Sequence, residues 1–401
     1  MRFPEFTGEW HRTTIGDCCS PLEYGMNAPA KEYDGANKYI RITDIDEDTC
    51  TYKRDDIVSP NAQLEDKYKV QKNDILFART GASTGKAYLY NEKDGLMYYA
   101  GFLIRGNVKQ DYNAKFVFLQ TQTQKYKKWV DVMSIRSGQP GINSQEYSDF
   151  KFYLPPSKAE QDRISTLFTL LDERISTQNR IIAQLQSLMT GLNNYLMDNP
   201  SWENVRVGDF MDFYSTNSLS WEQLDYNQGE VKNLHYGLIH SGLPTLIDCR
   251  TSSLPNIKDE FLPKQYTLCE DGDVAFADAS EDTNEVGKAV EIIDCRKQSI
   301  ICGLHTIHGR DKANATIVGF KGFAFNAKYF HDQLRRISQG SKIYSISTDN
   351  IKSCFLRIPP KSEQEKIVRL LSTYLQKIDV AEQTLKAYQV QKQYLLKSLF
   401  I

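Results

Sequence analysis

Two segments of the chain carry apolar side chains at the alternating spacing of three and four residues that is typical of paired helices. Each segment follows a Pro-Pro pair, at residues 155–156 and 359–360. The apolar seam predicted for the first helix is Ile164, Leu167, Leu171, Arg174, Gln178, Ile181, Leu185, Leu188, Leu192 and Tyr195, and that for the second is Ile367, Leu371, Tyr374, Ile378, Ala381, Leu385, Tyr388, Lys392, Leu395 and Leu399. We expect these seams to pack against each other; the alternative is that each helix packs only on its own domain.

The starts of these helices carry the spacing of a capping box. Ser157 is followed three residues later by Glu160, and Ser362 is followed by Glu365. We therefore predict that the helices begin at these serines.

The two halves of the chain repeat the same motifs in the same order, which indicates a duplication and not an array of short repeats. Residues 73–78 match 272–277, 85–87 match 287–289, and 154–156 with Glu160-Gln161 match 358–360 with Glu363-Gln364. Each copy begins with a globular segment. In the first copy, strand-like runs at residues 39–42, 74–77 and 102–104 alternate with turn residues, and a helix is expected over 114–132. This mixture predicts an α+β domain.

The order of these segments predicts the domain organisation. We expect an α+β domain over residues 1–155, a helix over 156–199, a second α+β domain over 200–358 and a second helix over 359–401. If the seams pair, the helices are antiparallel, and they form a coiled-coil spacer with a pseudo-two-fold axis between the domains. A helix of roughly 34 residues spans about 50 Å.

The charge and cysteine content exclude several classes of protein. Lys and Arg number 49 and Asp and Glu number 51, for a net charge of −2, so any nucleic-acid binding must rest on local basic patches. The eight cysteines contain no C-x-x-C pair, which favours free buried thiols in a reducing compartment. His305 and His308 have no thiol or carboxylate at ligand spacing in the sequence, so no metal site is predicted. No signal peptide and no membrane-spanning run are evident, which makes the cytoplasm the expected location.

Motifs for catalysis are also absent. Residues 81–87 read GASTGKA, whereas a P-loop needs four residues between its glycines and Ser or Thr after the Lys. Neither Leu-Pro-Pro nor Ile-Pro-Pro has the leading polar residue of an adenine methyltransferase loop. We therefore expect this chain to have no catalytic residues.

The combination of motifs resembles the specificity subunits of type I restriction-modification systems. The resemblance rests on FPEF…W…IGD at the N-terminus, NDILFARTG at residues 73–81, Gly85-Lys86, the two Pro-Pro…Glu-Gln helix starts and the duplicated layout. It implies two target-recognition domains that read double-stranded DNA, assembly with two modification (methyltransferase) subunits and with restriction/translocase subunits, and a split, asymmetric recognition sequence. S-adenosylmethionine, ATP and Mg²⁺ then belong to the partner chains, and this chain itself holds no cofactor. In the second half, residues 278–283 depart from residues 79–84, which makes the transfer of contacts there less direct.

Side chains with donors and acceptors in polar loops are the candidates for DNA contact. Arg41 lies in a strand-like run, where it has an alternative role as an ion-pair partner of Asp44 or Asp46. The candidates are Arg41, Arg79, Thr80, Ser83, Thr84, Lys86, Lys125, Lys127, Lys128, Arg136, Ser137, Gln139 and Asn143 in the first domain, and His235, Tyr236, Lys288, Gln339, Ser341, Lys342 and Tyr344 in the second. Two alternatives remain open: paired heads that bind protein partners, and an enzyme such as a fused nuclease.

Overall fold

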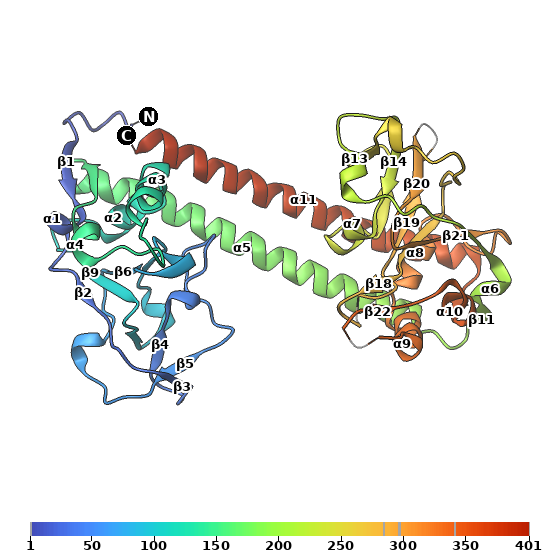
Figure 1. The fold of residues 1–401 in the computed structure, drawn as a ribbon, viewed down its shortest axis with the longest axis horizontal. Helices are drawn as coiled ribbons and strands as arrows, with labels where there is room; N and C mark the ends of the chain where they lie inside the picture. The colour runs from blue at the N-terminus through green and yellow to red at the C-terminus, as the bar shows by residue number, and fades with distance from the viewer. Residues whose placement is uncertain (1, 284, 296–297, 341, 401) are drawn as a thin grey trace. The chain divides into compact units, whose positions relative to one another are not determined.

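The computed structural model describes residues 2–283, 285–295, 298–340 and 342–400. The chain divides into two compact units. The N-terminal unit holds Met1–Gln178 and Thr384–Ile401, and the C-terminal unit holds Asn179–Gln383. Each unit contains an α+β domain and part of two long helices, α5 (Lys158–Met197) and α11 (Lys361–Leu399) (Figure 1). No helix in the described ranges is long and apolar enough to cross a membrane.

The domain of the N-terminal unit is built on a four-stranded sheet in the order β2-β9-β6-β7, with two-stranded sheets β1-β10, β3-β5 and β4-β8 beside it. The central strand β6 is buried along its whole length. The elements are β1 (His11–Thr14), α1 (Ile15–Cys18), β2 (Glu23–Tyr24), β3 (Ala30–Glu32), β4 (Lys38–Ile40), β5 (Val58–Pro60), β6 (Asp74–Ala78), β7 (Ala87–Leu89), β8 (Met97–Tyr99), β9 (Leu103–Asn107), α2 (Ala114–Gln120), α3 (Gln124–Met133), α4 (Ser144–Ser148) and β10 (Lys151–Leu154).

The predicted elements of this domain are present with shifted ends. β6 covers the run predicted at 74–77, and β9 begins at Leu103, one residue after the predicted start of its run. β4 ends at Ile40, before the predicted end of its run at residue 42. The helix expected over 114–132 is two helices, α2 and α3. The Thr123 side chain accepts a hydrogen bond from the amide of Tyr126 and thereby starts α3 as a separate helix.

The domain of the C-terminal unit has a five-stranded sheet, β12-β21-β17-β19-β15, and a four-stranded sheet, β13-β16-β14-β20. The pairs β11-β23 and β18-β22 complete it. The elements are β11 (Glu203–Arg206), α6 (Val207–Phe210), β12 (Met211–Tyr214), β13 (Leu224–Asp225), β14 (Val231–Leu234), α7 (Tyr236–His240), β15 (Leu246–Asp248), β16 (Asn256–Ile257), β17 (Val274–Ala277), β18 (Ala279–Ser280), β19 (Ala289–Ile293), β20 (Ser299–Cys302), β21 (Thr306–Asp311), α8 (Phe320–Phe325), α9 (Lys328–Ile337), β22 (Tyr344–Ser345), α10 (Thr348–Ser353) and β23 (Phe355–Ile358).

Both domains close in the same way, as the sequence repeat predicts. The first strand of each domain pairs antiparallel with its last strand, β1 with β10 and β11 with β23, and the Pro-Pro pair follows directly. The repeated glutamine then ties each long helix to its domain. Buried Gln161 accepts from the Asn113 amide (3.0 Å) and donates to the Pro155 carbonyl. Buried Gln364 accepts from the Ile317 amide (2.8 Å) and donates to the carbonyls of Ala315 and Pro359.

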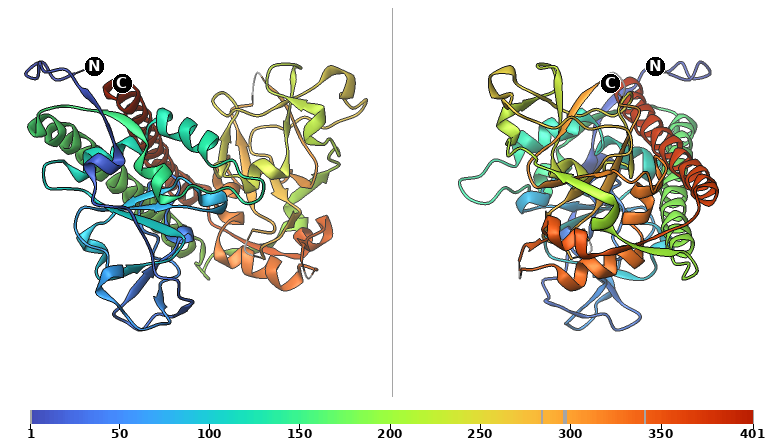
Figure 2. Two further views of the ribbon diagram at one scale, coloured as in Figure 1. Left: turned by 60° about the vertical axis from the view of Figure 1, so that its left-hand side comes forward. Right: turned by 90° about the vertical axis from the view of Figure 1, so that its right-hand side faces the viewer.

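The two long helices pack together antiparallel, as their contacts within each unit show. In the N-terminal unit, Leu396 and Leu399 near the end of α11 share a core with Ile164 and Phe168 near the start of α5. In the C-terminal unit, the start of α11 shares a core with the end of α5 at Met197. Figure 2 shows both helices uninterrupted, α5 in green and α11 in red. The pairing predicted from the seams is therefore present.

The seam of α11 is confirmed, but four of the ten positions predicted for the seam of α5 are exposed. Ile181, Leu188 and Tyr195 are exposed, Tyr195 by 80%. Arg174, also predicted in the seam, is exposed too, but its guanidinium lies 5.9 Å from the ring centroid of Tyr388 of α11. The positions that turn inward are each one residue later: Ile175, Ile182, Met189 and Leu196. The seam therefore repeats every seven residues from Ile164. Within each repeat the second buried residue lies four residues after the first, whereas three residues were predicted.

The predicted capping boxes are not formed. Glu160 is fully buried and accepts from Arg2 (2.6 and 2.7 Å) and from the Trp10 indole (3.1 Å), so it fixes the N-terminal segment to α5. In the second copy α11 already begins at Lys361, which places Ser362 inside the helix. The amides of Glu363 and Gln364 bond to the Pro360 carbonyl, as those of Glu160 and Gln161 bond to Ser157.

Candidate nucleic-acid interface

The two polar loops predicted in the first domain lie side by side. We call residues 79–86 together with 136–143 the N-terminal loop pair. The Gly81 amide donates to the Pro140 carbonyl and the Ile142 amide to the Arg79 carbonyl, both at 2.9 Å. Thr80 and Gly141 form an antiparallel bridge between these bonds. Segments more than fifty residues apart thus form one continuous surface feature.

Two buried tyrosines hold this loop pair by hydrogen bonds to its backbone. The Tyr126 hydroxyl donates to the Gly85 carbonyl (3.0 Å), and the Tyr147 hydroxyl donates to the Ala78 carbonyl (2.6 Å). Burial raises the pKa of both phenols, so both stay protonated donors. Gly85 has φ +90°, and an added Cβ would lie 2.5 Å from Val130 of α3. The backbone of residues 79–86 is therefore held in one conformation.

Several side chains of the N-terminal loop pair are exposed and polar. Ser137 and Gln139 are exposed. The Arg79 guanidinium lies 4.9 Å from the ring centroid of Tyr24, which holds it against the sheet edge as a flat cation. Burial raises the pKa of Tyr24, but the Ser144 amide and Arg79 outweigh it and lower the pKa overall.

Other predicted residues of these loops are engaged within the domain. Nη2 of Arg136 donates to both carboxylate oxygens of Glu146, each at 2.7 Å, and the Asn143 side chain caps the N-terminus of α4. Lys86 pairs with Glu47 at 3.1 Å. The Thr84 hydroxyl donates to the Gly81 carbonyl, and the Ser83 carbonyl accepts from the Lys86 amide. These contacts shape the loops, and DNA contact by the same side chains stays a prediction.

Helix α3 supplies positive charge beside the loop pair. Lys127 and Lys128 are exposed on α3, which packs on the loop through Val130. Lys125 lies over the ring of Tyr153 (4.9 Å), and burial together with Arg12 lowers the pKa of its ammonium.

The C-terminal unit builds the same feature from its own loops. We call residues 278–288 and 339–346 the C-terminal loop pair; residues 284 and 341 of it lie outside the described ranges. β18 pairs antiparallel with β22, and the Ile346 amide donates to the Asp278 carbonyl (2.9 Å), as Ile142 does to Arg79. The Gly287 amide donates to the Ala277 carbonyl, as Gly85 does to Ala78. Leu334 of α9 packs on Gly287 as Val130 packs on Gly85.

Comparison with known proteins places both halves in one family. The family described as "Type I restriction modification DNA specificity domain" matches residues 8–187 and again residues 199–387. The chain belongs to this family. It is the specificity subunit of a type I restriction-modification system, a non-catalytic subunit whose role is DNA target recognition within the complex.

Solved structures share the fold of this specificity subunit. The S subunit of a type I restriction-modification system from M. genitalium superposes with a TM-score of 0.61 at 14% identity, covering 98% of this chain and 96% of that one. A chain from a structural study of complex assembly and conformational transition of the type I system gives a TM-score of 0.58, also at 14% identity, with 98% of both chains covered.

Two residues of the specificity subunit that are predicted to contact DNA also make contacts within the C-terminal or N-terminal domain. Arg41 forms ion pairs with Asp44 (2.8 Å) and Asp56 (2.9 Å), which bears out the ion-pair alternative with Asp44. His235 is 2% exposed, and its Nδ1 accepts from the Gly237 amide to cap α7. Burial and His305 lower the pKa of His235, so this imidazole is neutral. These contacts stabilise their own segments, and DNA contact by either side chain stays a prediction.

The remaining residues of the second domain lie at or near the C-terminal loop pair. Gln339 and Lys342 are exposed, and Tyr344 is half-buried in β22. Ser341 lies outside the described residues. Lys288 pairs with Glu285 (2.9 Å) and, with Arg335, lines a pocket of about 510 Å³. Tyr236 contacts the ring of His305 edge-on, with centroids 5.1 Å apart.

The aromatic side chains that support these loops were not predicted from the sequence. Tyr24, Tyr126 and Tyr147 position Arg79 and the backbone around Gly85, but they come from three distant segments. Of these, only Tyr126 carried a signal, because it lies within the basic run 125–129.

Proposed function

We propose that each loop pair reads one half of a bipartite DNA site, and that the two halves have different sequences. The proposal rests on one observation: the two loop pairs have the same backbone bonds but carry side chains of different chemistry at the same position. Arg79 and Asp278 take the same position in their domains. The Arg79 amide donates to the Phe102 carbonyl and the Asp278 amide to the His305 carbonyl, both at 3.0 Å, just before β9 and β21. The carbonyl of each residue accepts from an amide of the second loop. A cation in one domain and a carboxylate in the other favour different base edges.

The chemistry of these side chains suggests their partners. Arginine bonds with two parallel donors to guanine O6 and N7, and a carboxylate accepts from the cytosine amino group. Gln139 has the geometry for adenine, whereas Lys127 and Lys128 suit phosphates. Burial raises the pKa of Asp278, and the His305 side chain, 3.1 Å away, opposes that shift.

We further propose that this subunit works in the cytoplasm with two modification subunits and with restriction/translocase subunits. S-adenosylmethionine, ATP and Mg²⁺ are then bound by those chains, and the target adenines are flipped into their pockets. The exposed faces of α5 and α11 are the proposed docking surfaces. Leu188, Tyr195, Val380 and Val390 are large apolar side chains exposed on them, from 53% to 80%.

The test is a pair of substitutions, Arg79→Ala and Arg79→Lys, in the full complex with its methyltransferase. Lysine keeps the charge and loses the planar fork, so base readout fails in both variants while a phosphate contact survives in Arg79→Lys. Methylation of a DNA library randomised over the site should lose preference at one base pair of one half-site, by roughly 5- to 150-fold. Unchanged base preference in both variants contradicts the assignment.

A further inference from the structure

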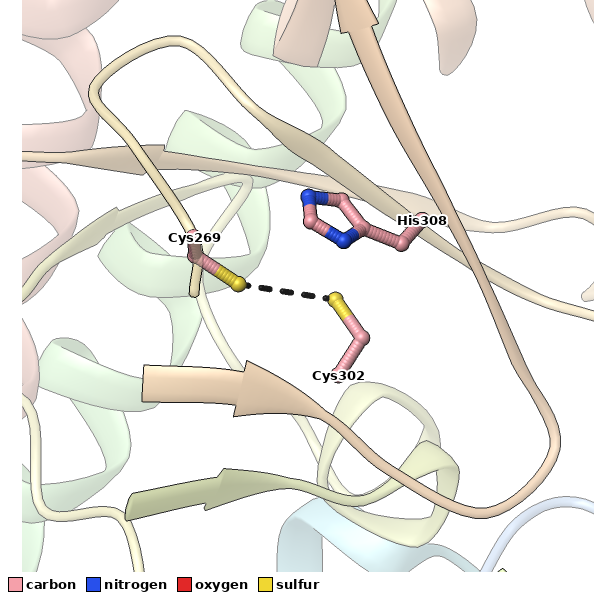
Figure 3. A group of neighbouring side chains, drawn as sticks. All are labelled: Cys269, Cys302 and His308. Atoms are coloured by element: carbon pink, nitrogen blue, oxygen red, sulfur yellow. Dashed lines mark hydrogen bonds between the residues drawn. The ribbon is translucent and has the colours of Figure 1, made fainter. Parts of the chain in front are cut away.

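Three side chains with metal-ligating atoms meet inside the C-terminal unit. Cys269 precedes β17, Cys302 ends β20, and His308 lies in β21. Their sulfur and nitrogen atoms lie within 4.8 Å of one another, and the residues are 5%, 2% and 0% exposed. Figure 3 shows one ring nitrogen of His308 turned toward the two sulfur atoms.

The spacing of the two sulfurs fits a shared metal ion. Zinc binds thiolate sulfur at about 2.3 Å, so two such ligands at a tetrahedral angle lie about 3.8 Å apart. The observed distance between Sγ of Cys269 and Sγ of Cys302 is 3.7 Å. A disulfide needs about 2.05 Å, which this pair does not approach.

The imidazole is oriented as in a metal ligand. His308 Nε2 is hydrogen-bonded to Asp273 at 2.7 Å, and Asp273 is held in turn by Arg310 (2.8 and 2.7 Å). A carboxylate on one ring nitrogen fixes the proton there and leaves a lone pair on the other, as in carboxylate–histidine–zinc triads. That other atom, Nδ1, is fully buried and has no hydrogen-bond partner. An unpaired buried nitrogen costs free energy that a bound ion removes.

We propose that Cys269, Cys302 and His308 bind a thiophilic divalent cation of the zinc class. Binding releases both thiol protons to solvent, and the two thiolates and neutral imidazole then balance the charge of the ion. Three protein ligands leave a tetrahedral ion one position for water. The ion would link β20 of the four-stranded sheet to β21 of the five-stranded sheet, beside His305, whose carbonyl holds Asp278 in the C-terminal loop pair.

The test uses the reduced, full-length chain incubated with Zn²⁺ or Co²⁺ and then desalted. The wild-type protein should retain about one ion per chain, and Co²⁺ should produce thiolate charge-transfer and tetrahedral d–d absorption. Cys302→Ser and His308→Ala should lose retention at least tenfold. Cys354→Ser is the matched control, because Cys354 is a buried thiol of the same unit outside this cluster, and it should bind like wild type.

The cobalt spectrum of the wild-type chain can overturn the proposal without any variant, in case the substitutions unfold the unit. Wild-type protein that keeps no metal and shows no cobalt–thiolate band overturns the proposal. Equal metal retention by Cys302→Ser and Cys354→Ser overturns it as well. Neither outcome depends on the DNA specificity of the subunit.

Discussion

The repeated glutamine at the start of each long helix should be a structural anchor whose loss affects only its own unit. Gln161→Leu keeps the volume but leaves the Asn113 amide and the Pro155 carbonyl without their partner. Each buried polar group left unpaired costs about 1–3 kcal/mol, so the two groups together predict a loss of about 2–6 kcal/mol in the N-terminal unit. Gln364→Leu removes three bonds, to Ile317, Ala315 and Pro359, and should cost the C-terminal unit at least as much.

Hydrogen exchange of the full-length chain is the suitable assay, because a two-unit protein need not unfold in one step. A loss of about 2 kcal/mol in the free energy of opening a unit increases the rate of its amide hydrogen exchange roughly thirtyfold. Gln161→Leu should speed it in peptides of residues 103–170, and Gln364→Leu in peptides of residues 306–370. Gln184→Leu, at an exposed position of α5, is the control and should change little. The reasoning is refuted if both variants behave like this control, or if each destabilises the opposite unit.

Three further predictions follow from single sites. Gly287→Ala puts a side chain at φ +77° and 2.4 Å from buried Leu334, so it should lower the free energy of unfolding of the C-terminal unit by about 1–3 kcal/mol, measured by hydrogen exchange. Gly191→Ala in α5 meets no atom within 4 Å and should be neutral or stabilising in the same assay. Burial raises the pKa of Asp172, but Lys115 and Lys392 lower it more, so its folded pKa is depressed. The stability that Asp172 contributes is fully present above its unfolded pKa of about 3.9 and is lost as the pH falls through its folded pKa. In Asp172→Asn, hydrogen-exchange protection of the N-terminal unit should therefore depend less on acid pH than in wild type. The same pH dependence in both proteins would argue against the ion pairs. Lys127→Ala with Lys128→Ala should reduce the slope of log affinity against log salt by about 1–2 for DNA binding by the complex, and a slope like that of the exposed control Lys93→Ala excludes phosphate contacts there.

The helical layout could be predicted from sequence because it depends on local periodicity. The seven-residue frame from Ile164 was correct, but adjacent apolar pairs such as Ile181-Ile182 and Leu188-Met189 leave open which member faces inward. Only the partner helix decides this, because the i+3 and i+4 positions lie about 60° and 40° to either side of position i and are both neighbours of it. One local sign was available: the predicted seam included the charged Arg174, although the apolar Ile175 follows it directly.

The two loops of each domain could also be located from composition, since glycine and polar residues mark them. Their pairing could not be predicted, because it depends on backbone bonds between distant segments, as between Gly81 and Pro140. The roles of individual side chains were less accessible still. The ion pairs of Arg136 with Glu146 and of Arg41 with Asp56 could not be read from the sequence, because each joins residues ten or more positions apart.

The cluster of Cys269, Cys302 and His308 shows the same limit. The sequence analysis found no thiol at ligand spacing from His308, because ligand-spacing motifs apply to residues on one turn or hairpin. Here the three residues come from separate segments that two sheets bring together. Such a site becomes visible only when strand order is known.

Mapping of methylated adenine across the genome most directly tests the claim that each loop pair reads one half-site. Cells would express the methyltransferase with the wild-type subunit, with a subunit whose N-terminal loop pair carries Arg79→Ala and Gln139→Ala, or with no subunit. We predict a split motif with a fixed gap that requires the subunit, and a variant motif that is relaxed in one half and unchanged in the other. A motif altered in both halves, or methylation that does not depend on the subunit, would contradict the account.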